Sequence, residues 1–362
     1  MQDMRAGFGY ISQPMSAAPR KSSKKPPARS SASEGLSIVL PAYNEADGLP
    51  RLHERIALVA RELKRRYGLR VETIYVDDGS SDATFRIASG LPNDMVDVQV
   101  LALSRNFGKE AALAAGLDHA RFGAVIFMDS DGQHPPELIE TLVSRWLDEG
   151  HDVIYTAKAH RQKETFTHRF GTDWFYRLVN WGSDHKIPQD AGDFRLLSPR
   201  AAAALRRLPE RNRFLKGLSS WIGFKQVRVD YEPEPRAHGS SSWNYWRLLL
   251  LSIEGLTSFS VAPLRVASLL GLLLAALAML FGIKIVIETL IYGEDVPGYP
   301  SLVVGMMVIG GVQLIMIGVL GEYIAKMLSE AKQRPTYFIA DHQIKVAAPA
   351  KAGPATEKHI AE

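Results

Sequence analysis

The stretch that decides the fold is AVIFMDSDGQHPPE, residues 124–137. Its first five residues form an apolar run that predicts a buried strand, and Pro135-Pro136 before Glu137 predicts the first turn of a helix. Asp129 and Asp131 therefore fall at the carboxyl end of a strand. Open α/β sheets place their ligands at that end.

Asp129 and Asp131 stand one residue apart, so both carboxylates can reach one hard divalent cation. Mg²⁺ and Mn²⁺ take such oxygen ligands and usually complete their shells with waters and substrate phosphates. The pair predicts a site for a metal-bound diphosphate. The alternative is a solvated acidic turn, which Asp-x-Asp alone does not exclude.

The bulk properties narrow the class of protein. At 362 residues the chain has room for one large domain and a smaller part. A formal net charge of +4 is too small to indicate nucleic acid as a partner, and the absence of cysteine excludes disulfides and thiolate metal sites. Residues 1–34, rich in Ser, Pro and basic residues, predict a disordered basic arm.

Strand and helix patterns alternate after this arm. Apolar runs predict strands at 36–40, 71–76 and 98–103; helical spacing of apolar residues follows the first, and an Ala-rich helix follows the third. This alternation predicts an α/β fold with a mostly parallel sheet. The polar clusters that follow the strands are then expected around one crevice: Pro41-Ala42-Tyr43-Asn44-Glu45, Asp77-Asp78-Gly79-Ser80-Ser81-Asp82, Arg105-Asn106-Phe107-Gly108-Lys109 and the stretch from Asp129 to Glu137.

These four motifs, in this order, resemble those of glycosyltransferase family 2. The similarity is greatest to its membrane-anchored branch, the polyprenyl-phosphate glycosyltransferases, which includes bactoprenol glucosyltransferases and dolichol-phosphate mannose synthases. It covers roughly Leu36 to Ile339, and four ordered motifs are far more specific than one. The resemblance implies a GT-A fold and a nucleotide-sugar donor.

The resemblance also implies roles for individual residues. Two alternatives stay open at this stage, namely that Asp77 only orders its turn and that Tyr43 only packs in the core. A turn capped by aspartate would likewise explain Asp193 and Arg195. The implied nucleotide-sugar-binding residues are Pro41, Tyr43, Glu45, Asp77, Asp78, Lys109 and Asp129; the metal ligands are Asp129, Asp131 and Gln133; the catalytic residues are Asp129, Asp131, Asp193 and Arg195.

The acceptor phosphate is expected at a basic stretch. A predicted strand at 153–156 is followed by Lys158, Arg161 and Arg169 and then by an aromatic amphipathic pattern at 170–179, which suits a headgroup boundary. The alternative is a solvated loop and a helix that covers the sheet. In related dolichol-phosphate mannose synthases, arginines after this strand bind the phosphate; here the positions match approximately. Ser242-Trp243 replaces a Lys-Tyr pair found in many relatives, so no role is assigned to that loop.

The C-terminal third predicts membrane attachment. Aromatic residues in 241–263 favour interfacial helices, and two uncharged runs predict a transmembrane hairpin at 264–325, with helices at about 266–291 and 301–324. The loop between them lacks Lys and Arg, whereas both flanks are basic, so the catalytic domain and both termini are expected in the cytoplasm at the inner membrane. Glycines in the second run favour close helix packing and a homo-oligomer.

Residues 326–362 are expected to be a cytoplasmic segment whose tail, from Ala340 onward, is disordered. The expected reaction is inverting transfer of a hexose from UDP-glucose to polyprenyl (undecaprenyl) phosphate, with Mg²⁺ or Mn²⁺ as cofactor. GDP-mannose and UDP-N-acetylhexosamines remain alternative donors.

Three competing functions are weighed. A processive polysaccharide synthase would carry Gln-x-x-Arg-Trp and more transmembrane helices. A dehydrogenase would carry Gly-x-Gly-x-x-Gly where residues 41–45 stand. A catalytically inactive membrane scaffold is opposed by the intact Asp129, Asp131 and Gln133.

Overall fold

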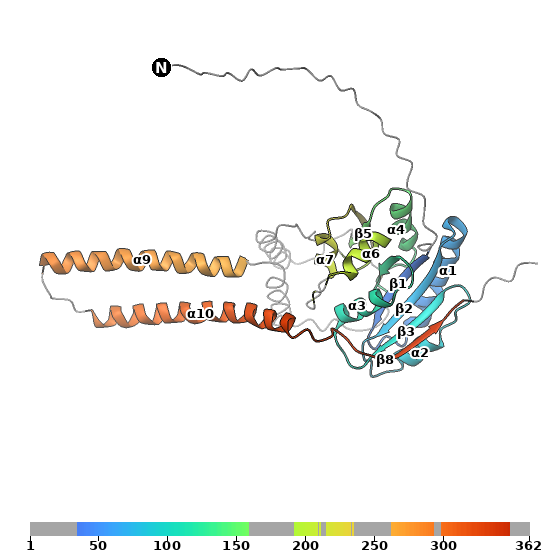
Figure 1. Cartoon of the computed structure of the whole chain (residues 1–362), viewed down its shortest axis with the longest axis horizontal. Helices are drawn as coiled ribbons and strands as arrows, with labels where there is room; N and C mark the ends of the chain where they lie inside the picture. Colours follow the sequence, from blue (N-terminus) through green and yellow to red (C-terminus); the bar gives the residue numbers. More distant parts are fainter. Residues whose placement is uncertain are drawn as a thin grey trace, which may run out of the picture. The chain divides into compact units, whose positions relative to one another are not determined.

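The computed structural model describes residues 35–158, 192–208, 210, 215–232, 234, 262–292 and 298–347. Figure 1 shows the course of the chain and labels most of its elements. The strands are β1 Gly35–Ala42, β2 Arg70–Asp77, β3 Asp97–Leu103, β4 Ala124–Phe127, β5 Val153–Lys158, β6 Arg195–Leu197, β7 Gln226–Tyr231 and β8 Ile339–Lys345. The helices are α1 Leu49–Tyr67, α2 Thr84–Gly90, α3 Lys109–His119, α4 Leu138–Leu147, α6 Pro199–Arg206, α7 Leu215–Trp221, α9 Ala262–Tyr292 and α10 Tyr299–Ala331.

The strands form one sheet in the order β7-β5-β6-β4-β1-β2-β3-β8. β4, β1, β2 and β3 run parallel to their neighbours in that row, as does β7 to β5. β6 is antiparallel to β4 and β5, and β8 is antiparallel to β3. The prediction of an α/β fold with a mostly parallel sheet is confirmed, and the carboxyl ends of β1 to β4 meet at one edge.

The sheet is covered on both faces because its strands are apolar on both. Along β1, Leu36, Ile38 and Leu40 pack with α1, α2 and α4, whereas Val39 packs with α3, α6 and α7. Full burial of each such side chain contributes about 1.5–3 kcal/mol. The helices on the two faces therefore hold β1 and β4 in the centre of a three-layer core.

Two glycines permit close approaches that fix the site. Gly116 of α3 lies against Val39, and a Cβ there would come within 2.2 Å of the valine Cγ1. Gly79, with φ 68°, follows β2 in the left-handed region, where a Cβ would meet the backbone of Arg105 at 2.5 Å. The loops after β2 and β3 are consequently in direct backbone contact.

The expectation of disorder from Ala340 onward is wrong for residues 340–347. Residues Ile339–Lys345 form β8, and Ala347 N donates to Asp97 Oδ1 at 2.8 Å. The segment has little apolar pattern of its own, because its stability comes from hydrogen bonding to the edge of β3 rather than from side-chain burial. Residues beyond 347 and the predicted arm at 1–34 lie outside the described residues, as does the interfacial segment as far as residue 261.

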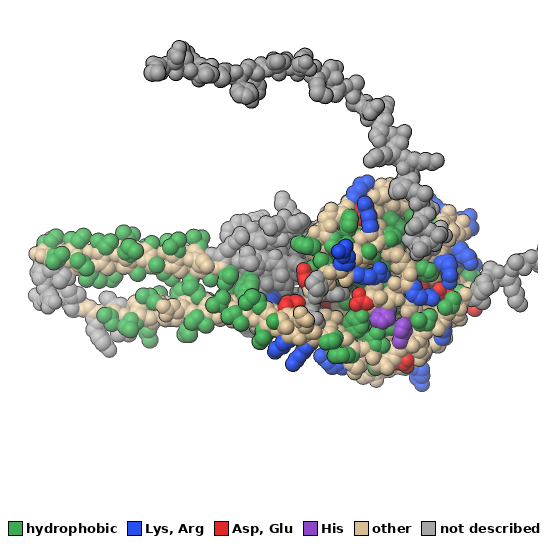
Figure 2. All heavy atoms as spheres, in the orientation of Figure 1, with side chains coloured by type: hydrophobic (Ala, Val, Ile, Leu, Met, Phe, Trp, Pro, Cys, Tyr) green, Lys and Arg blue, Asp and Glu red, His purple; other side chains and the backbone are tan. Residues whose placement is uncertain are grey.

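Helices α9 and α10 contain spans, Val266–Glu288 and Val304–Ala331, that are long and apolar enough to cross a membrane. Their apolar side chains are exposed along both helices, as Figure 2 shows. α10 runs to Ala331, past the predicted end at residue 324. Its last two turns, residues 325–331, consist almost entirely of good helix formers, so the helix continues beyond the apolar run.

Candidate active site

The loops after β1 and β2 are hydrogen-bonded to each other. Asn44, in the left-handed region at φ 56°, accepts from Ser81 N through its side-chain oxygen at 2.9 Å, while its own N–H donates to Ser80 Oγ at 2.9 Å. Glu45 N donates to Thr84 Oγ1 at 2.9 Å. These bonds fix the loop that holds Tyr43 and Glu45. Tyr43 itself is 50% exposed, so the alternative that it packs in the core is wrong.

Asp77 and Asp78, at the end of β2, are 6% and 4% exposed. Asp78 accepts from Phe107 N at 2.7 Å and from Gly108 N at 2.9 Å, and Asp77 accepts from Ser80 N at 3.1 Å. Burial raises the pKa of Asp78, and the two N–H donors oppose that rise. Both carboxylates therefore order loops in this structure. Their predicted contacts with the nucleotide stay predictions.

Asp129 begins the loop after β4, and two contacts fix its backbone. Its N–H donates to His134 Nδ1 at 3.3 Å, and Ser130 Oγ donates to Pro41 O at 2.8 Å. His134 packs against the rings of Phe194 and Tyr231, and burial lowers its pKa. A neutral imidazole that accepts at Nδ1 carries its proton on Nε2.

A row of alternating charges extends from Asp129. Lys109 Nζ lies 2.5 Å from Asp129 Oδ1 and 2.7 Å from Asp193 Oδ2, and Lys216 Nζ lies 3.0 Å from Asp193 Oδ1. Although burial opposes ionisation, Lys216 and Lys109 hold the pKa of Asp193 well below its ordinary range. Burial also opposes ionisation of Lys109 by lowering its pKa, but the carboxylates of Asp193 and Asp129 raise that pKa above its ordinary value. The structure thus brings together three predicted site residues, Asp129, Lys109 and Asp193, in one row of ion pairs.

Arg195 and Glu110 lie beside this row. Arg195 is 2% exposed and donates to Gly192 O at 2.6 Å and to the Ser219 hydroxyl, so it links the backbone just before Asp193 to α7. Glu110 accepts from Leu215 N at 3.1 Å, and burial raises its pKa to about 7. The predicted catalytic role of Arg195 stays a prediction.

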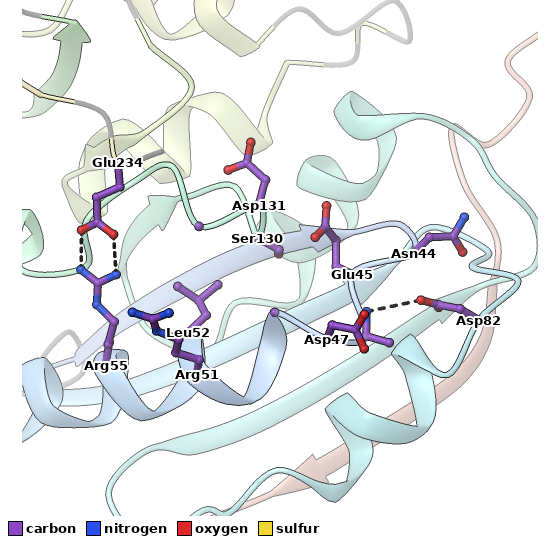
Figure 3. A pocket seen from close by; sticks show the side chains of 13 residues that line it. Asn44, Glu45, Asp47, Arg51, Leu52, Arg55, Asp82, Ser130, Asp131 and Glu234 are labelled. Carbon is purple, nitrogen blue, oxygen red and sulfur yellow. Dashed lines mark hydrogen bonds and ion pairs between the residues drawn. The ribbon is translucent and has the colours of Figure 1, made fainter. Parts of the chain in front are cut away.

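A cavity of about 350 Å³ opens between the loop after β1, the start of α1 and the loop after β4. Glu45 and Asp131 line it, and Arg51 and Arg55 rise from α1 on its other side (Figure 3). Arg55 donates two bonds to Glu137, at 3.0 and 2.7 Å, and two to Glu234, at 2.9 and 2.7 Å. This double clamp joins α1 to the loops after β4 and β7 that border the cavity.

The oxygen donors predicted for a metal fit Mg²⁺ or Mn²⁺ chemically. Asp129, Asp131 and Gln133 offer carboxylate and amide oxygens, and Asp131 Oδ1 accepts from Gln133 N at 3.0 Å, which keeps the two residues together. Lys109 already contacts Asp129 Oδ1, so a cation there would share that carboxylate with an ammonium. Among the described residues, His, Cys, Asp and Glu make no group of three placed to hold a metal ion.

Most of the predicted acceptor site lies outside the described residues. Lys158 ends β5, but its side chain is outside the description, and Arg161 and Arg169 lie outside the described residues. Their roles stay predictions.

Sequence reasoning missed four contributors to the site: Glu110, His134, Lys216 and Arg55. His134 lies inside the quoted stretch, and Lys216 lies in Arg213-Phe214-Leu215-Lys216-Gly217, which resembles a family segment, so both had a signal. Glu110 and Arg55 had none, because a charged residue on a helix usually faces solvent.

Known proteins that are similar to this chain in sequence are described as glycosyltransferases. Residues 37–206 match the family model described as glycosyl transferase family 2. The chain is 43% identical over 306 residues to a protein of Synechocystis sp. described as an uncharacterized glycosyltransferase, covering 84% of this chain and 95% of that one. It is 42% identical to the bactoprenol glucosyl transferase of Shigella phage SfV, over 86% of this chain and 99% of that one. A prophage bactoprenol glucosyl transferase homolog of Escherichia coli is 40% identical, over 84% of this chain and 98% of that one.

Proposed function

The chain belongs to glycosyltransferase family 2, and on this premise we propose that it transfers a hexose from a nucleotide sugar to a polyprenyl phosphate at a membrane surface. The observation that carries the proposal is the edge of the sheet where Lys109 joins Asp129 to Asp193, while Asp131 of the same loop as Asp129 lines the cavity. UDP-glucose is the first donor to test. Similarity to bactoprenol glucosyl transferases over nearly their full length supports this choice.

The charges of the site suit departure of a nucleoside diphosphate. Asp129, Asp131 and Gln133 would hold Mg²⁺ or Mn²⁺, which would neutralise charge developing on the leaving diphosphate. Lys109 adds a fixed positive charge. Its two carboxylate partners raise the pKa of the Lys109 amine and so keep that amine protonated. Asp193, held ionised, can accept a hydrogen bond from a sugar hydroxyl.

The acceptor needs little activation under this proposal. A phosphate monoester has a second pKa of about 6 and is largely a dianion at neutral pH. Direct attack on the anomeric carbon would invert its configuration. Asp193 is a weak base because two ammonium groups stabilise its carboxylate, which suits a reaction that requires no strong general base.

Membrane attachment would bring the enzyme to its lipid acceptor. α9 and α10 would supply two membrane spans, and the charges that flank them favour a cytoplasmic catalytic domain. Lys158, Arg161 and Arg169 would then bind the acceptor phosphate. The glycines of α10 favour an assembly of several copies.

The test is a panel of nucleotide sugars incubated with the purified chain and undecaprenyl phosphate in vesicles. We expect one sugar to yield a lipid whose mass equals that of polyprenyl phosphate plus one hexosyl residue, which is a hexose less one water. The Asp131→Ala protein is the matched control. Release of free sugar without a lipid product, from every donor in the panel, would contradict the proposal.

A further inference from the structure

A short connection joins the second apolar helix to the edge of the catalytic sheet. α10 ends at Ala331, and residues 332–336 separate it from Tyr337, whose side chain bonds to α3 of the sheet domain. A fully extended chain of this length spans at most about 22 Å between the Cα atoms of Ala331 and Tyr337. The local geometry makes it shorter, because Gln333 turns back at φ 47° and its N–H donates to Glu330 O at 3.2 Å.

The segment after this connection is firmly attached. Tyr337 Oη donates to Asp118 Oδ2 of α3 at 3.0 Å, and the Phe338 carbonyl accepts from Ser104 N at 2.9 Å. β8 then pairs with β3, and Asn93 Nδ2 donates to Val346 O at 2.9 Å. The attachment therefore extends from Tyr337 to Ala347.

The attached strand is the one that leads into the donor motif. β3 ends at Leu103, and the loop after it carries Phe107 and leads to Lys109, the first residue of α3. The ring of Phe338 lies 6.3 Å from that of Phe107, whose N–H is bound to Asp78. The end of α10 is thus joined by a few residues to the loop that positions Lys109.

We propose that residues 332–347 are a leash that holds the nucleotide-sugar edge of the sheet close to the membrane end of α10. The proposal rests on the proposed function, because it assumes a lipid acceptor and a membrane-spanning α10. The other connection between the sheet and the apolar helices, residues 235–261, lies outside the described residues. Tyr337 and Phe338 are positioning residues in this scheme and touch no substrate.

The experiment lengthens the leash in the full chain. Gly/Ser segments of roughly 8 and 16 residues are inserted between Gln333 and Arg334, and the same segments are inserted after Ala347 as matched controls. Effective concentration falls as about the −3/2 power of linker length, so the longer insertion should lower transfer to lipid acceptor in vesicles by on the order of fivefold to tenfold. Nucleotide-sugar affinity should stay within about twofold of wild type.

A second readout is independent of activity. The chain has no cysteine, so Ala340→Cys on exposed β8 gives a single attachment point for a dye. In nanodiscs that contain a headgroup quencher, we expect quenching to weaken with each insertion before Arg334 and to stay constant with the control insertions.

The two readouts separate the possible failures. Unchanged transfer together with unchanged quenching in the longest insertion would overturn the leash, as would a loss of nucleotide-sugar affinity equal to the loss of transfer. If the wild-type chain transfers no sugar to polyprenyl phosphate, the proposed function fails, and the quenching series still decides whether the leash restrains the sheet.

Discussion

β2 and β4 flank β1, and two aspartates lie at or just after the carboxyl end of each. Asp77 and Asp78 are almost fully buried, and their oxygens accept backbone N–H groups from Ser80, Phe107 and Gly108. In the second pair, Asp129 meets the ammonium of Lys109 and Asp131 lines the cavity. The same sequence feature therefore builds loops at one strand end and presents charge at the other. Whether such a pair orders a loop or presents charge depends on its burial and on its hydrogen-bond donors, and both depend on tertiary structure.

The largest expected effect is on activity. Asp131→Ala should lower the turnover number by on the order of 10²–10³-fold, because charge on the departing diphosphate would lose part of its stabilisation. Its free energy of unfolding should fall by no more than about 1.5 kcal/mol, because the variant loses the bond from Gln133 N but removes no core side chain. Turnover is measured with labelled nucleotide sugar, with and without excess chelator. Full activity of the variant, or of wild type in chelator, would contradict the metal site.

Asp78→Asn should show the opposite profile, with stability affected first. Asparagine keeps one acceptor oxygen, so the N–H of either Phe107 or Gly108 loses its partner, and the free energy of unfolding should fall by about 2–3 kcal/mol. The measurement is urea denaturation of the detergent-solubilised chain followed by tryptophan fluorescence. Asp131→Asn is the matched control. Equal stability of the two variants would erase the distinction between the pairs.

The sequence predicted the position of the acidic pairs better than their roles. Apolar runs located β1 to β5, and the turn residues after them located the loops, because both signals are local. The alternative that Asp77 orders its turn has support from its bond to Ser80 N. β8 was missed because its pairing with β3 joins residues far apart in the chain, and Lys216 and Glu110 were not assigned because only the fold brings α7 beside α3.

Glu110 is a buried carboxyl that forms no ion pair with a described residue, so it extends the comparison of the two aspartate pairs to a third kind of acidic site. Its pKa is raised by burial from its ordinary 4.5 to about 7, so the folded state binds more protons than the unfolded state between these values. The stabilisation from protonated Glu110 is complete below pH 4.5 and lost as pH rises through about 7. Relative to Glu110→Gln, which keeps an acceptor for Leu215 N, wild type should lose on the order of 1–3 kcal/mol across this range. Parallel stability curves of the two proteins from pH 4.5 to 8 would exclude the raised pKa.

The smallest expected effect comes from the far end of the charge row. Lys216→Met keeps the length of the side chain but removes the ammonium that lies 3.0 Å from Asp193 Oδ1, leaving Lys109 on the other oxygen. Loss of one charge-assisted hydrogen bond is worth about 1.5 kcal/mol, or about tenfold in turnover if Lys216 acts by orienting Asp193. Nucleotide affinity should be unchanged, and Lys216→Arg should recover most of the activity.

The double variant with Asp193→Asn distinguishes positioning from a direct role. If Lys216 acts only through Asp193, the double variant is no slower than Asp193→Asn alone. Fully additive losses would show instead that Lys216 contacts a substrate itself. The group of residues that present charge to the substrate would then include α7 as well as the loop after β4.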